Sequence, residues 1–150
     1  MERFAVASQG PGGLKAIVDF RFARCPYYTI VEVEDGEISG VREMQNSHAH
    51  TGHGAGIAAA QMLASLGVTA VVAGSIGPNA YSVLRSMNIK VYTGIHGITV
   101  EEAVRKIIRE EVKPAEAPSR PGWALRLGMG RGMGRGRGGG GGRWRSTSPL

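Results

Sequence analysis

The chain has 150 residues, which is room for one domain. All twelve Asp and Glu residues lie at or before Glu116, whereas residues 117–150 hold seven of the 18 Lys and Arg and no acid, so the net charge of +6 comes from the C-terminal segment. This distribution argues against a folded domain with a basic nucleic-acid-binding surface, and the single cysteine excludes an internal disulfide.

The first half of the sequence predicts three strands. A short apolar run at residues 4–8 predicts the first strand, and a stretch of turn-forming residues follows it directly. Residues 28–33 and 38–44 alternate as strands do, and Asp35 and Gly36 between them are typical of a two-residue hairpin turn. We therefore expect the second and third strands to be antiparallel.

The second half predicts helices and strands in alternation. The expected helices lie at residues 57–66, 78–87 and 99–112, and the expected strands at residues 68–73 and 89–92. Thr99 and Glu102 have the spacing of a capping box, and Pro114 is expected to end the third helix. Helical crossovers require parallel strands, so we predict an α/β fold with a mixed sheet of about five strands and helices on its faces.

The chain consists of two segments that differ in composition. Residues 1–112 are predicted to form the α/β domain. Residues 113–150 are rich in Pro and then in Gly and Arg, and cannot bury enough surface to offset the chain entropy lost on ordering. We expect this second segment to be a disordered tail. No apolar run resembles a signal peptide or a membrane span, so we expect a cytoplasmic protein without membrane contact.

Three histidines lie within six residues, at the junction between the third strand and the first helix. Imidazole and thiolate are the side chains that bind iron and other borderline metals well, and Cys25, just before the second strand, could approach the same edge of the sheet. The candidate metal ligands are therefore His48, His50, His53 and Cys25. The alternative is that these histidines cap the helix or bond the loop backbone, and that Cys25 is a small buried hydrophobic residue.

A second candidate region could bind negative charge. The loop at residues 74–79 follows a buried strand and leads into a helix, where backbone amides can bind an anion. Arginines near Cys25 could orient the same anion, or could pair with Asp19 or face solvent. The candidate residues for cofactor binding are Arg21, Arg24, Gly74, Ser75, Gly77 and Asn79. The alternative for the glycines is a tight turn.

Four stretches, at residues 19–28, 46–48, 54–61 and 72–80, together resemble the dinitrogenase iron-molybdenum cofactor biosynthesis family, of the NifX and NifB C-terminal-domain type. The resemblance covers residues 3–112 and implies a three-layer α/β/α fold with a ribonuclease H-like motif. Ala23 stands where that family usually has glycine, and Ser47 stands where proline is common.

The resemblance also implies what the domain binds. It implies a carrier of an iron–sulfur or iron–molybdenum-type cluster, bound transiently, with cluster donor and acceptor proteins as partners and a monomer or homodimer as the functional unit. One cysteine is too few for a four-thiolate cluster site, so the cluster would keep other ligands or be shared across a dimer.

We expect no enzymatic activity, because no nucleophile–base pair or carboxylate pair stands out in the sequence. The alternative function is an interaction module whose Arg- and Gly-rich tail binds RNA or protein partners. Arginine with interleaved Trp123 and Trp144 can bind single-stranded nucleic acid by phosphate attraction and base stacking.

Overall fold

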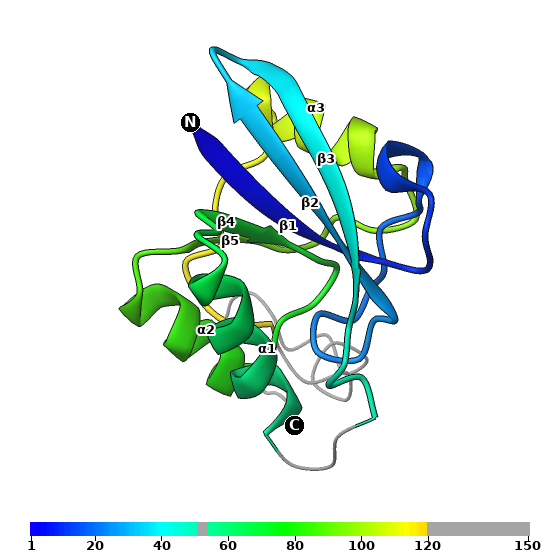
Figure 1. Ribbon diagram of the computed structural model, residues 1–150. Helices are drawn as coiled ribbons and strands as arrows, with labels where there is room; N and C mark the ends of the chain where they lie inside the picture. Colours follow the sequence, from blue (N-terminus) through cyan, green and yellow to red (C-terminus); the bar gives the residue numbers. More distant parts are fainter. Residues whose placement is uncertain (51–53, 120–150) are drawn as a thin grey trace, which may run out of the picture. The chain divides into compact units, whose positions relative to one another are not determined.

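One mixed sheet organises the computed structural model, which describes residues 1–50 and 54–119 (Figure 1). Its strands are β1 (Glu2–Ser8), β2 (Tyr27–Glu34), β3 (Glu37–Gln45), β4 (Ala70–Val72) and β5 (Lys90–Tyr92). The strand order is β3-β2-β1-β4-β5. β1 pairs antiparallel with β2 and parallel with β4, and β4 pairs parallel with β5. The predicted mixed sheet is thereby confirmed.

The turn between β2 and β3 confirms the predicted hairpin. Asp35 has φ 52° and Gly36 has φ 77°, so both residues adopt the left-handed conformation that a tight two-residue turn requires. The two strands pair antiparallel from Glu34 opposite Glu37 to Tyr27 opposite Gln45.

Helices cover both faces of the sheet and make three layers (Figure 1). The helices are α1 (Ala55–Ser65), α2 (Pro78–Ser86) and α3 (Val100–Ile108). α1 and α2 pack on one face, over a core that includes Tyr28 and Leu63. α3 packs on the other face against Phe4 and its neighbours. A single 3-10 turn, η1 (Gly13–Lys15), which the sequence did not predict, lies against α3.

The third helix begins as predicted but ends early. The Thr99 hydroxyl accepts a hydrogen bond from the Glu102 amide at 3.2 Å and caps the helix. The apolar stripe stops at Ile108, and Glu110 turns the chain with φ 60°. The expected end before Pro114 is therefore wrong by one helical turn, because the left-handed residue ends the helix first. Within the described residues, no helix is long and apolar enough to span a membrane.

The chain after α3 stays on the domain as far as residue 119. The Ala115 amide donates to the Val91 carbonyl at 2.6 Å, which covers the outer edge of β5, and the Tyr81 hydroxyl donates to the Ala115 carbonyl at 3.1 Å. Ser119 bonds the backbone of Ile76. The compact unit spans Met1–Ser119, seven residues beyond the boundary expected at 112. We call residues 113–119 the strap; residues 120–150, and the tail predicted there, lie outside the described chain.

Candidate functional site

Three loops meet at one end of the sheet, where ligands bind in open α/β folds. They are residues 19–26, which precede β2, residues 46–50, which follow β3, and residues 73–77, which follow β4. The first and third loops are joined by an isolated parallel bridge between Arg21 and Ser75. The sequence-predicted site residues on these loops are thus brought to the same end of the sheet.

Asn46 fixes the histidine loop to the loop before β2. Its side chain is buried, and its amide nitrogen donates to the Ala23 carbonyl at 3.0 Å and to the Cys25 carbonyl at 2.8 Å. Its amide oxygen accepts from the His48 backbone amide at 2.9 Å. Because a buried side-chain amide with three partners has one favourable orientation, Asn46 determines where the histidine loop starts.

His48 is half-buried and His50 is exposed, so both imidazoles are accessible from solvent. Arg24 lies beside them, and its guanidinium donates to the Ala49 carbonyl at 3.1 Å. The third predicted ligand, His53, lies outside the described residues. Within the described chain, no three His, Cys, Asp or Glu side chains group closely enough to hold a metal ion.

Cys25 faces the core below this surface. Its side chain is fully buried, and the thiol donates to the Phe22 carbonyl at 3.3 Å. The Tyr28 hydroxyl donates to the same carbonyl at 2.6 Å. Burial raises the pKa of the Cys25 thiol to about 11, so the thiol of the metal-free protein keeps its proton at neutral pH.

Most amides of the predicted anion-binding loop already have partners. The Gly74 amide donates to the Asp19 carbonyl at 3.2 Å and the Ser75 amide to the Phe20 carbonyl at 2.7 Å. The Ile76 amide donates to the Ser119 hydroxyl at 3.0 Å. An anion at this loop would therefore have to bind at the start of α2, where Gly77 is the N-cap residue and Asn79 is exposed.

The two candidate arginines differ in their surroundings. Arg21 pairs with the buried carboxylate of Asp19 at 3.2 Å, although more than half of its own side chain is exposed. The Arg21 amide also donates to the Asp19 carboxylate at 3.0 Å. Arg21 thus helps to hold the loop before β2 while keeping its charge at the surface.

Two residues of this region were missed in the sequence. Asn46 follows a strand directly and precedes the histidines, which is the position of a residue that could tie a loop down. Phe20 is 49% exposed, and its ring is perpendicular to the His96 imidazole with ring centroids 5.1 Å apart. Their contact joins segments 76 residues apart in sequence, and no local pattern predicts such a pair.

Comparison with known proteins gives a consistent family assignment. Residues 2–110 match the protein family described as dinitrogenase iron-molybdenum cofactor. The apo form of the orange protein from Desulfovibrio gigas is 35% identical, with a TM-score of 0.74, and the match covers 80% of this chain and 98% of that one. A candidate NifB protein from Thermotoga is 32% identical with a TM-score of 0.68, over 81% of this chain and 100% of that one. An uncharacterized protein of Methanocaldococcus jannaschii is 33% identical over 63% of this chain and 80% of its own length.

Proposed function

Because the chain belongs to the dinitrogenase iron-molybdenum cofactor family, we propose that it binds and carries an iron–sulfur or iron–molybdenum-type cluster between donor and acceptor proteins. In this role the cluster is cargo, held transiently at the loops that meet at the carboxyl ends of β1, β3 and β4. The single observation that carries the proposal is the Asn46 junction, which holds the start of the histidine loop against the segment that bears Arg24.

The chemistry of these loops suits a cargo that is released again. Accessible imidazoles bind iron and other borderline metals, and Arg24 places a positive charge next to the His48 and His50 loop, where an anionic cluster would lie. A site with few protein ligands leaves the cluster other coordination positions, through which an acceptor protein can take it over. Ligation by imidazoles and attraction by Arg24 involve no catalytic step, so the carrier role requires no enzymatic activity.

We assign cargo ligation to His48, His50 and His53, and an internal supporting role to Cys25. The Cys25 thiol shares the Phe22 carbonyl with the Tyr28 hydroxyl, so it takes part in packing the loop before β2. Direct ligation by Cys25 would require this segment to open and the thiol to lose its proton. The predicted role of Cys25 as a ligand would therefore demand a different conformation of the loop.

Anaerobic reconstitution of the full chain with iron and sulfide tests the proposal. We expect the protein to bind iron and to develop visible absorption. Replacement of all three loop histidines (His48→Ala, His50→Ala and His53→Ala) should remove most of both signals, because the proposed ligands are lost, and neither His48 nor His50 belongs to the buried core.

Glu37→Gln is a control, since Glu37 is an exposed residue at the start of β3, the end of that strand away from the cargo loops, and its replacement should leave iron binding intact. Cys25→Ala should also retain cargo. A wild-type protein that stays colourless and free of metal would overturn the carrier proposal, whereas full binding by the triple variant would overturn only the assignment of the ligands.

A further inference from the structure

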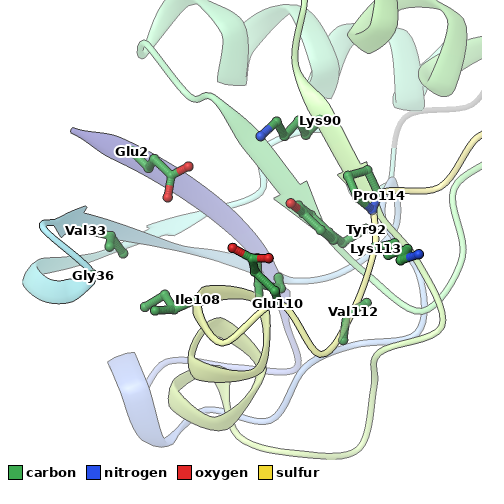
Figure 2. Close-up of a pocket in the computed structure, with 11 residues that line it drawn as sticks. Glu2, Val33, Gly36, Lys90, Tyr92, Ile108, Glu110, Val112, Lys113 and Pro114 are labelled. Atoms are coloured by element: carbon green, nitrogen blue, oxygen red, sulfur yellow. The ribbon is translucent and has the colours of Figure 1, made fainter.

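A cavity of about 390 Å³ lies at the opposite end of the sheet from the three loops (Figure 2). Its walls come from the first residue of β1, both ends of β5, the end of β2 with the hairpin that follows, and the end of α3 with the chain that leaves it. The volume falls within the range of small-molecule sites. The apolar part of its wall includes Val33, Ile107, Ile108 and Val112.

The Tyr92 side chain is buried, and its hydroxyl is the polar group that it presents to the cavity. Tyr92 is 6% exposed, and its ring is fixed against Phe4 with the ring centroids 6.5 Å apart. Within residues 1–50 and 54–119, the hydroxyl forms no hydrogen bond, and Figure 2 shows it directed into the cavity. Buried hydroxyls in native proteins are nearly always bonded to protein or water, so one that points into a cavity without a protein partner is available to the polar group of a ligand.

The charged side chains that line the cavity are two acids and two lysines, and only Lys90 of the two lysines is directed toward this hydroxyl, which leaves an excess of negative charge next to it. In Figure 2 the carboxylates of Glu2 and Glu110 and the amine of Lys90 are directed toward the same space as the Tyr92 hydroxyl, while the amine of Lys113 points away. None of these four charged side chains forms an ion pair within the part of the chain that is described. The C-terminal end of α3 adds negative potential next to Ile107 and Ile108.

We propose that this cavity binds a small organic ammonium ion with an apolar body. The ammonium group would lie between Glu2 and Glu110 and donate to their carboxylates, while the Tyr92 hydroxyl oxygen would accept another of its protons. The apolar body would cover Ile108 and Val112. A bare metal ion suits the cavity poorly, because the described chain offers no third carboxylate, cysteine or histidine there and much of the wall is apolar. This site is independent of the cargo loops.

Titration of the full chain with 2-phenylethylammonium, followed by calorimetry and by amide shifts in the NMR spectrum, tests the proposal. We expect saturable binding with shifts at Tyr92 and Ile108, and no saturable binding of 3-phenylpropionate, which has a similar body and the opposite charge. Glu2→Gln and Glu110→Gln should each weaken binding about tenfold, since each removes a charged hydrogen-bond acceptor.

Tyr92→Phe keeps the ring and should weaken binding about threefold. Glu37→Gln is the matched control, because Glu37 is an exposed acid on β3 that does not line the cavity. Both exposed cavity acids can be replaced without disturbing the core, so loss of folding does not obscure the result. Absence of saturable binding, equal binding of the carboxylate probe, or full binding by both glutamine variants would overturn the proposal.

Discussion

At the scale of single residues, the Cys25 thiol links the stability of the protein to pH. Burial raises its pKa from the ordinary value of 9.0 to about 11, so the folded state holds the proton where the unfolded chain releases it. The contribution is fully present below pH 9 and is lost as the pH rises toward 11. A shift of this size predicts a loss of about 2–3 kcal/mol in unfolding free energy across that window.

Urea unfolding of the wild type and of Cys25→Ala between pH 7 and pH 11 measures this effect. Burial also raises the pKa of Tyr28, and Cys25 adds to that shift, so the difference between the two curves reports the thiol together with its coupling to Tyr28. The difference should be constant below pH 9 and then shrink. Two curves that stay parallel to pH 11 would show that the thiol ionises equally in both states.

At the scale of elements, the contact between the turn after β4 and the segment before β2 requires glycine at position 74. A Cβ atom there would lie 2.8 Å from the Phe20 Cα and 3.0 Å from its carbonyl oxygen. These are backbone atoms held by the Ser75–Phe20 hydrogen bond at 2.7 Å, so they cannot move without breaking it. We expect Gly74→Ala to destabilise the protein by about 1–3 kcal/mol, measured by urea unfolding.

Gly77→Ala is the control in the same loop. Position 77 has φ −72°, and no atom lies within 4 Å of the place that an alanine Cβ would take. Alanine therefore fits there and should change stability by less than about 1 kcal/mol. Equal losses of unfolding free energy in the two variants would mean that the close backbone contact between positions 74 and 20 does not require glycine at position 74.

The elements also show what sequence can predict. The Thr99 cap and the Asp35–Gly36 turn are local signals, and the structure has both in their expected places. The arrangement of five strands and three helices follows from such signals together with hydrophobic periodicity. The end of α3 was misplaced because Glu110 adopts a left-handed conformation that its residue type does not favour.

The site was predictable only in part. Loops that flank strands of known direction can be placed at one end of a sheet, which is why Cys25 was expected to approach the edge of the sheet that carries the histidines. The bonds that give the site its shape join distant segments, such as Asn46 to Cys25 and Ser119 to Ile76. The burial of Cys25 depends on the same long-range packing, and no local pattern contains it.

At the scale of the whole molecule, the strap determines at which residue the chain can be truncated without destabilising the domain. A chain ending at Ser119 keeps the Ala115–Val91 and Ser119–Ile76 bonds, whereas a chain ending at residue 112 loses both and exposes the edge of β5. Net contributions of about 1 kcal/mol per bond predict that the shorter chain melts at least about 5 °C lower. Thermal melting of chains 1–112, 1–119 and 1–150 measures this. Equal melting of all three would show that the strap does not stabilise the domain.

Truncation after Ser119 also separates the nearly neutral part of the chain from its strongly basic part. Residues 1–119 carry twelve acids and eleven Lys and Arg, while residues 120–150 carry seven Arg and no acid. If the arginine-rich segment binds single-stranded RNA, the affinity of the full chain should fall with salt, with a logarithmic slope no steeper than about −5, since each contacted phosphate contributes about −0.7.

Fluorescence anisotropy with a single-stranded RNA at several salt concentrations measures that slope for chains 1–150 and 1–119. We expect the shorter chain not to bind, because its net charge is slightly negative and it lacks the segment with Trp123 and Trp144. The strap is intact in both proteins, so a loss of binding cannot be attributed to a damaged domain. Binding retained by chain 1–119 would instead place RNA on the folded domain and refute a role for the arginine-rich segment.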